Sequence, residues 1–479
     1  MALSTTRNVD ITASSWGDNI TSLLAIQAPS AQRTAKVPPE ATIARMVKIA
    51  NNYLNRPRMG GDQLCQLHTI EDYPFLVAQK RADMSRFLVI PLKSWPHPGS
   101  SGKKIELGVK IDLSSQAVSL VAVSTFKLIF DLEAAQKAAA ELPRGRKKLE
   151  RWAYLSNYEI RRQGTKTQIA IDSDIRDIPQ YLPILASGLV QDEDGEETEQ
   201  ILITPLCQGD LLKKMDAEGE KELRRGPFWS LAERVGASRE IILAVRGIHN
   251  RNIVHLDLKP ENLVLPFDGG VKIIDFEFAQ DLSKIPLQEV NVTRGTPCYL
   301  SPERVCWAKL RIGVPEMDDF PRYRTNFTEI DFKRMDLWAL GIILASMNES
   351  CLKLNGKNNL INRLDKALGP WINRMLTEKA IHDHIDQYLF PDQGESLTTM
   401  YRSLLTYNPD KRTITFENMM DTLDAVGTGP ISRPLSTEPP PSSVVVLNAT
   451  DQPQAACAAA PPGDGTLPPT DGPPDSKDD

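Results

Sequence analysis

Four side chains whose types suit phosphoryl transfer lie within one short stretch of the sequence. The segment HLDLKPENLVL carries Asp257, Lys259 and Asn262, and the apolar segment IIDFEFA that follows it carries Asp275. Phosphoryl transfer needs a carboxylate that orients the attacking hydroxyl and accepts its proton, a cation beside the moving phosphoryl group, and oxygen ligands for Mg²⁺. A polar loop that only joins a helix to a strand would not require these types in this order, so we interpret the stretch as a phosphotransfer site.

The order and spacing of these residues resemble the catalytic loop and the metal-binding motif of the protein kinase superfamily. The resemblance implies that Asp257 positions the substrate hydroxyl as a base and that Lys259 stabilises the transferred phosphoryl group. It implies that Asn262 and Asp275 hold Mg²⁺ or Mn²⁺. It also implies a kinase of the eukaryotic-like Ser/Thr type, with ATP as the phosphoryl donor and a protein hydroxyl as the acceptor.

Three later segments extend the resemblance through the C-terminal part of the chain. GTPCYLSPE (295–303) is similar to the end of a kinase activation segment, where Thr296 would line the site of the substrate hydroxyl. MDLWALGIIL is similar to the buried central helix of the large lobe, in which Asp336 would accept hydrogen bonds from the backbone of the catalytic loop. NPDKRT supplies Arg412 as the expected partner of Glu303 in a buried ion pair, which is costly to break from one side.

The same resemblance assigns a nucleotide-binding role to QILITPLCQGDL. This segment would be the last strand of the small lobe and the hinge, with Thr204 as gatekeeper and the backbone from Pro205 to Cys207 facing adenine. Ala122 and Val264 would sandwich the adenine ring. A plain buried strand is the competing interpretation, because apolar runs are common.

The expected phosphate-binding lysine is missing from the small lobe. GSSGKKIELGV is a poor glycine-rich loop, and SLVAVSTF has Ser124 where the family has that lysine. Lys127, further along the strand, or the loop residues Lys103 and Lys104 could replace it, although each could also be an ordinary exposed lysine. Because strand side chains alternate between two faces, Lys127 would point opposite to Ser124 unless the strand carried a bulge or had already ended.

Three acidic residues bear on the same region. The helix that brings a glutamate to the lysine is expected to include KKLERWAYLSNY, which makes Glu150 the first candidate and Glu141 the second. Glu277 replaces the glycine that usually follows the aspartate and phenylalanine of the metal motif. Its carboxylate could bind a second cation, or the residue could stiffen the turn.

Leu256 stands where many regulated kinases carry an arginine that pairs with an activation-loop phosphate. We therefore predict activity that does not depend on activation-loop phosphorylation. A pseudokinase that acts as a binding scaffold is the alternative, because the lysine is displaced and Glu277 adds a side chain beside the metal. A small-molecule kinase would lack the GTPCYLSPE segment.

Composition restricts the partners and the location of the protein. A net charge of -6 over 479 residues offers no global attraction to nucleic acid. The six cysteines lack metal-ligand spacing, and no apolar run approaches the length of a membrane span. We expect a cytoplasmic protein, in its own cytosol or, if it is a secreted bacterial effector, in that of a host. The Pro-rich C-terminal tail could serve as a peptide ligand.

The order of predicted elements gives the fold class and the domains. Strand-like runs (RFLVIPL, SLVAVSTF, QILITPL) precede helical patterns (SREIILAVRGIHNRN, DLWALGIILASM, SLTTMYRSLLTY), which predicts an α+β, bilobal, protein kinase-like fold with a small β-rich lobe and a larger helical lobe. The chain also has an expected insertion at 307–335 near the substrate-docking face. The predicted units are a flexible leader (1–40), a helical N-terminal extension (41–87), a kinase-like domain (88–427, with lobes 88–206 and 207–427) and a disordered tail (428–479).

Overall fold

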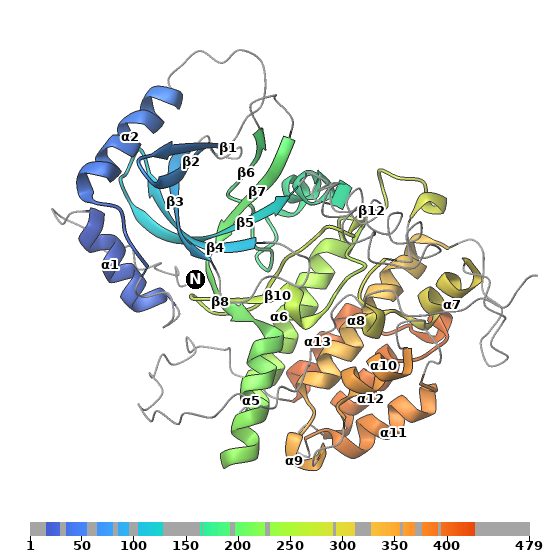
Figure 1. The fold of residues 1–479 in the computed structure, drawn as a ribbon. Coiled ribbons are helices and arrows are strands. Elements are labelled where there is room, and N and C mark those ends of the chain that lie inside the picture. The colour runs from blue at the N-terminus through green and yellow to red at the C-terminus, as the bar shows by residue number, and fades with distance from the viewer. Residues whose placement is uncertain are drawn as a thin grey trace, which may run out of the picture.

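A computed structural model of the chain contains a sheet-rich lobe followed by a helical lobe, with the strand β8 (Cys207–Asp210) between them (Figure 1). This architecture is the predicted α+β, bilobal fold. Lys103, Glu150 and residues 312–326 of the insertion lie outside the described residues, as does the C-terminal tail. The structure describes residues 16–28, 35–54, 65–79, 85–94, 104–127, 163–164, 166–191, 197–225, 230–290, 294–311, 327–354, 358–368, 376–390 and 394–426.

The small lobe is built on one seven-stranded antiparallel sheet with the strand order β1-β2-β3-β4-β5-β7-β6. The three runs that the sequence predicts as strands are β3, β5 and β7. The bounds are β1 Cys65–Ile70, β2 Tyr73–Gln79, β3 Arg86–Ser94, β4 Lys104–Asp112, β5 Val118–Lys127, β6 Ala186–Gln191 and β7 Glu197–Pro205.

The sheet curls until its two edge strands, β1 and β6, lie against each other. One face thereby encloses a small apolar core that includes Phe87, Val89, Val121 and Val123. Gly108 of β4 is buried against this core, and a Cβ at this position would lie 2.9 Å from Val123 Cγ2 and 3.0 Å from Val89 Cγ1. The interior therefore has no room for a side chain at position 108.

Two N-terminal helices, α1 (Trp16–Gln27) and α2 (Glu40–Leu54), cover part of the opposite face, as the blue elements of Figure 1 show. The sequence predicts a flexible leader over 1–40, but α1 forms within it because Ile20 and Leu24 fall on one helix face and are fully buried. The predicted helical extension over 41–87 likewise differs. It contains α2 as expected, but also β1 and β2, which add the outer hairpin to the sheet.

The large lobe is helical and packs around α8, which is buried along nearly its whole length. Capping boxes begin both long helices, with Ser230 and Glu233 at α6 and Thr328 and Asp331 at α8. The three helical patterns predicted from the sequence are α6, α8 and α12. The bounds are α5 Leu211–Arg225, α6 Leu231–His249, α7 Pro302–Arg311, α8 Glu329–Met347, α9 Cys351–Leu354, α10 Leu360–Leu368, α11 Glu378–Tyr388, α12 Gly394–Leu404 and α13 Phe416–Ala425.

Two small sheets hold the segments that carry the predicted site. The strands β8 (Cys207–Asp210), β10 (Leu263–Pro266) and β11 (Lys272–Ile273) form one sheet, and β9 (Ile253–Val254) pairs with β12 (Gln280–Asp281) in the other. The residues 255–262 and 274–279 therefore connect paired strands at both ends. No described helix is both long and apolar enough to cross a membrane.

Candidate active site

The loop that carries Asp257 is held in place by the buried carboxylate of Asp336. Asp336 accepts hydrogen bonds from the backbone N–H of His255 at 2.7 Å and of Leu256 at 2.9 Å, as the sequence predicts, and its Oδ2 lies 3.0 Å from His249 Nε2. Burial alone would raise the pKa of Asp336, but its interactions with His249 and His255 together hold the pKa below its usual value. Leu256 adopts a φ of 61°, a left-handed conformation that this anchor maintains.

Asp257, Lys259 and Thr296 form one cluster, as expected for a site that binds a hydroxyl and a phosphoryl group. Asp257 Oδ1 accepts hydrogen bonds from the backbone N–H and the hydroxyl of Thr296, at 2.7 and 2.8 Å. Lys259 Nζ lies 3.2 Å from Asp257 Oδ2 and 3.0 Å from Thr296 Oγ1. Burial alone would lower the pKa of Lys259, but three neighbouring carboxylates, Asp257 foremost, raise it. The lysine therefore stays charged.

Asn262 and Asp275, the predicted metal ligands, are held next to each other by the backbone. The N–H of Ile274 donates to the carbonyl of Asn262 at 2.9 Å, which fixes the position of the adjacent Asp275. The side-chain N–H of Asn262 donates to the Asp257 carbonyl at 2.9 Å, so that its side-chain oxygen remains an acceptor. Asp275 has a φ of 67°, a second left-handed residue in this site.

An amide oxygen and a carboxylate are a donor set that fits Mg²⁺, which commonly takes one or two protein ligands and completes its shell with phosphate oxygens and water. Within the described ranges, no group of three or more His, Cys, Asp or Glu residues could hold a metal by itself. The chemistry of the donors therefore fits a metal that binds together with a nucleotide.

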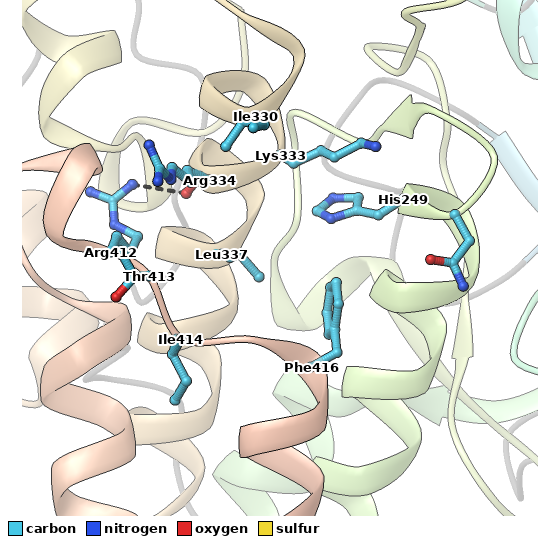
Figure 2. A pocket seen from close by; sticks show the side chains of 10 residues that line it. His249, Ile330, Lys333, Arg334, Leu337, Arg412, Thr413, Ile414 and Phe416 are labelled. Atoms are coloured by element: carbon cyan, nitrogen blue, oxygen red, sulfur yellow. Dashed lines mark hydrogen bonds between the residues drawn. The ribbon is translucent and has the colours of Figure 1, made fainter.

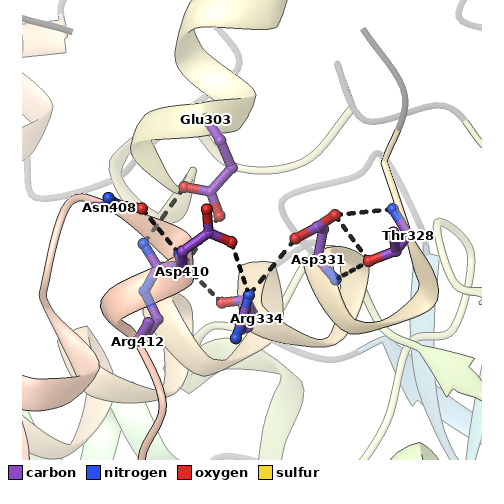
Figure 3. A network of polar contacts seen from close by, with 7 residues as sticks. All are labelled: Glu303, Thr328, Asp331, Arg334, Asn408, Asp410 and Arg412. Atoms are coloured by element: carbon purple, nitrogen blue, oxygen red, sulfur yellow. Dashed lines mark hydrogen bonds and ion pairs between the residues drawn. The ribbon is translucent and has the colours of Figure 1, made fainter. Parts of the chain in front are cut away.

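The buried ion pair predicted between Glu303 and Arg412 is present. Arg412 Nη1 lies 2.9 Å from Glu303 Oε1, and both side chains are almost completely buried. Arg412 also donates to the carbonyls of Arg334 and Thr406, at 2.8 and 2.9 Å. Figure 3 shows that this network joins the start of α7 to α8 and to the segment before α13. It fixes the C-terminal end of the segment that carries Thr296.

Comparison with known proteins agrees with this geometry. Residues 190–423 match the profile of the protein kinase domain. This part of the chain is therefore a protein kinase domain by similarity. The matched part begins near the end of β6, so it leaves out β1 to β5 of the small lobe.

Several curated proteins resemble parts of the chain. Serine/threonine-protein kinase ULK3 of Rattus norvegicus is 36% identical over 108 residues, which are 22% of this chain and 18% of that protein. Serine/threonine-protein kinase ssp1 of Schizosaccharomyces pombe is 25% identical over 225 residues, 46% of this chain and 29% of that protein. The liver/testis isoform of the phosphorylase b kinase gamma catalytic chain of Bos taurus is 34% identical over 134 residues, 26% of this chain and 29% of that protein. The chain thus aligns with less than a third of the length of each of these relatives.

A row of aromatic rings, which the sequence analysis did not predict, begins at Phe276, next to the predicted metal ligand Asp275. The ring of Phe276 lies 4.8 Å from that of His255 and 5.5 Å from that of Tyr181. The hydroxyl of Tyr181 donates to Asp172 at 2.7 Å, and Asp172 also accepts the backbone N–H of Ile184 at 2.9 Å. Asp172 belongs to the helical residues 166–175, so the row ties this helix to the catalytic loop. No local pattern in the sequence signals it.

Glu277 fits beside Asp275 and Phe276 because a glycine faces it. Glu277 is buried, and a Cβ on Gly164 would lie 3.0 Å from the Cβ of Glu277. Gly164 has no side chain and therefore leaves space for the side chain of Glu277. The predicted partner of the missing lysine, Glu150, and its alternative, Glu141, lie outside the described residues.

The residues predicted to contact adenine lie on or next to the strands β5, β7, β8 and β10. Ala122 of β5 is directly opposite Thr204 of β7, and Pro205 ends that strand. Cys207 begins β8, where burial raises the pKa of its thiol to about 12. Val264 is buried in β10, the strand that pairs with β8.

The register of the sheet separates Ser124 from two of the lysine candidates. β5 pairs with β7 without a register shift from Val121 to Lys127, so positions 124 and 127 belong to opposite faces of the sheet. Lys104 is directly opposite Thr125, which gives position 104 the same face as position 127. Its Nζ lies 2.9 Å from Glu106 Oε1, and its side chain is 59% exposed.

A separate hollow of about 300 Å³ lies in the large lobe and contains none of the predicted site residues. Figure 2 shows it between the end of α6, the start of α8 and the segment before α13. Apolar side chains such as Phe416 and Ile330 share its wall with the cations Lys333, Arg334 and Arg412. Two of these cations already have acidic partners: Arg412 pairs with Glu303, and Arg334 contacts Asp331 and Asp410 (Figure 3).

Proposed function

We propose that this chain is a Ser/Thr protein kinase that transfers the γ-phosphoryl group of ATP to a hydroxyl of a protein substrate. The observation that carries the proposal is the cluster of Asp257, Lys259 and Thr296, which brings a carboxylate and a cation together at a position where a hydroxyl can bind. The named activities of the similar curated proteins, all Ser/Thr or phosphorylase kinases among those cited above, support it.

The two oxygens of Asp257 suit different tasks. Oδ1 is held by Thr296, so Oδ2, next to Lys259 Nζ, accepts the proton of the substrate hydroxyl. The hydroxyl oxygen then forms its bond to the γ-phosphorus while the bond to the leaving ADP oxygen breaks. The charged Lys259 offsets the negative charge of the phosphoryl oxygens during this transfer.

Asn262 and Asp275 would hold Mg²⁺ or Mn²⁺ through their side-chain oxygens. Such an ion, when bound, neutralises charge on the ATP phosphates. The contribution of the chain is to keep the two ligands adjacent, through the bond between Ile274 N–H and the Asn262 carbonyl. Ala122 and Val264 would contact the adenine ring, and the hinge backbone from Pro205 to Cys207 would face its edge.

The proposed activity does not require a phosphate on the activation segment. Leu256 offers no cation to such a phosphate, and its side chain instead belongs to an apolar cluster with Leu282 and Val290 of that segment and Phe332 of α8. These contacts hold the segment by burial of apolar surface.

A catalytically inactive scaffold is the second candidate, and one observation favours it. The face of β5 that carries Ser124 is covered by the helix 166–175 through Leu202, Ile184 and Ile169. Lys104 and Lys127 occupy positions of the other face. The described residues thus provide no lysine on this face of β5 for the ATP phosphates, and Lys103 is the remaining candidate of the three.

The distinguishing experiment incubates the purified chain with radiolabelled ATP and either Mg²⁺ or Mn²⁺, and measures label in the chain itself and in dephosphorylated casein. We expect label with at least one ion, and its loss in Asp257→Ala. Asp177→Ala, which removes an exposed carboxylate paired with Arg251, is the matched control and should behave as wild type. More than a tenth of wild-type activity in Asp257→Ala contradicts the assigned role. ATP binding without any transfer supports the scaffold.

We also propose that the kinase works in cytosol, its own or a host's. The four cysteines whose side chains the structure describes are free thiols, which suits a reducing compartment. Detection of the chain by fractionation of cells that express it from its own promoter tests this location.

A further inference from the structure

The guanidinium of Arg304 is buried where two functional segments of the chain cross. Arg304 follows Glu303 at the start of α7, and its side chain points back toward the catalytic loop. Nη1 donates to the carbonyl of Leu256 at 2.8 Å, and Nη2 donates to the carbonyl of Arg294. One side chain therefore bonds to the backbone of both the catalytic loop and the activation segment.

The two carbonyls lie next to the reacting groups. Leu256 directly precedes Asp257, and Arg294 lies two residues before Thr296, whose N–H and hydroxyl bond to Asp257. Between them, Gly295 has a φ of 119°, and a Cβ there would lie 2.7 Å from the Leu256 carbonyl oxygen and 3.0 Å from Arg304 Nη2. The crossing is therefore too tight for any side chain, and its spacing is set by the guanidinium.

Arg304 has three carboxylates nearby, those of Asp336, Asp257 and Glu303. Burial lowers the pKa of Arg304 to about 10, so the side chain remains charged at neutral pH. A buried charge is kept where its hydrogen bonds and neighbouring charges compensate it, and a fork of N–H donors can bond to two carbonyls at once. A lysine at this position has no such fork.

We propose that Arg304 is a positioning residue that fixes the residues 294–300 against the catalytic loop, in place of the pair between an arginine and a loop phosphate. The neutral apolar contacts of Leu256 support the body of the activation segment, and Arg304 sets the distance between Thr296 and Asp257. The inference rests on the proposed function, because it names what assembles that same site without modification.

Three variants test the kinetic consequence, with casein as the acceptor. Arg304→Met should lower kcat about 10²-fold, the scale of a small misplacement of reacting groups, while the Kd for ATP changes less than about threefold. Arg304→Lys, with one nitrogen in place of the fork, should lose about tenfold. Arg234→Met removes another buried arginine, bonded to Asn348 and stacked on Phe390, and should keep the wild-type kcat. Wild-type kcat in either Arg304 variant overturns the proposal, even if the other fails to fold.

Hydrogen exchange of the backbone separates this proposal from the proposed function. In Arg304→Met or Arg304→Lys, the amides of residues 294–300 should exchange at least about tenfold faster, because their hold on the catalytic loop is released, whereas α8 and α12 exchange as in wild type. The Arg234→Met variant should leave residues 294–300 unchanged. Unchanged exchange of these residues in the Arg304 variants overturns the positioning role. Faster exchange in a chain that transfers no phosphate supports the positioning role and refutes the kinase activity.

Discussion

The two lobes are held together by different kinds of interaction. In the large lobe, identified polar bonds hold the catalytic loop and the activation segment, from those of Asp336 to those of Arg412. In the small lobe, the curled sheet, with the strands β1 and β2 and the helices α1 and α2, is held by apolar cores. Ser124 occupies the position at which the phosphate-binding lysine is expected. Phosphoryl transfer fixes residue types at given positions, whereas a barrel interior requires only shape and volume.

This contrast explains where the family match begins. Residues 190–423 contain the predicted catalytic residues and metal ligands, while β1 to β5 fall outside the matched part. A small lobe of this kind can keep its fold while its nucleotide contacts change. The following predictions are ordered from the largest expected effect to the smallest, and each concerns one side of the contrast.

Loss of Arg412 should have the largest effect on the large lobe. Arg412→Met leaves Glu303 charged and buried without its partner, which should lower the free energy of unfolding by about 3–5 kcal/mol. The double variant with Glu303→Met should recover much of that loss, since it leaves no uncompensated charge. Urea unfolding measures both. A loss below about 1 kcal/mol in the single variant would mean that the pair does not stabilise this lobe.

The catalytic carboxylates should separate chemistry from binding. Asp257→Ala should lower kcat at least about 10²-fold, because it removes a base, and leave ATP affinity in place. Asp275→Ala should weaken Mg²⁺-dependent ATP binding about 10- to 100-fold, the scale of a lost charge-assisted contact. Titration with a fluorescent ATP analogue, with and without Mg²⁺, measures the second effect. Equal affinities for wild type and Asp275→Ala in Mg²⁺ would refute the metal role.

The small lobe should be sensitive to volume rather than to charge. Gly108→Ala places a methyl group against Val89 and Val123 and should cost about 1–3 kcal/mol of stability. Hydrogen exchange should localise the damage to β3, β4 and β5. A Val123→Ala change in the same chain makes room for the new methyl and should recover part of the loss. No recovery would indicate that the barrel interior is not the site of the strain.

The missing lysine is tested by three separate Met substitutions. Because positions 104 and 127 belong to the face opposite Ser124, Lys103→Met should reduce ATP affinity and turnover about tenfold, while Lys104→Met and Lys127→Met stay near wild type. An active kinase that tolerates all three changes would contradict this account of the small lobe. A loss confined to Lys127→Met would require a bulge that β5 does not contain.

The smallest expected effect is that of phosphatase treatment. Because Leu256 has no charge and Arg304 already bonds to the activation segment, removal of phosphate from Ser283 or Thr293 should leave the rate within about twofold of the untreated chain. A mock-treated sample is the control. A large loss that maps to Thr293 would show that another cation, such as Arg294, pairs with a phosphate there.

The sequence was informative wherever chemistry or local periodicity restricts the choice of residue. Asp257, Lys259 and Thr296 were predicted together and lie together, and Asp336 and Arg412 make the bonds expected of them. The predicted strands and helices of both lobes were found because alternation and helical spacing are local properties. The leader was misjudged, because the Ser- and Thr-rich composition around α1 hides the few apolar residues that bury it.

What the sequence alone determined is the set of groups that phosphoryl transfer needs, since those residue types recur at short, fixed separations. The tertiary structure decided how they are supported, through contacts between residues far apart in the chain. Gly164 makes room for Glu277, Tyr181 packs on Phe276, and Arg304 bonds to the carbonyl of Leu256. Many pairs of residues can pack in this way, so no local sequence pattern predicts which pair a given chain contains.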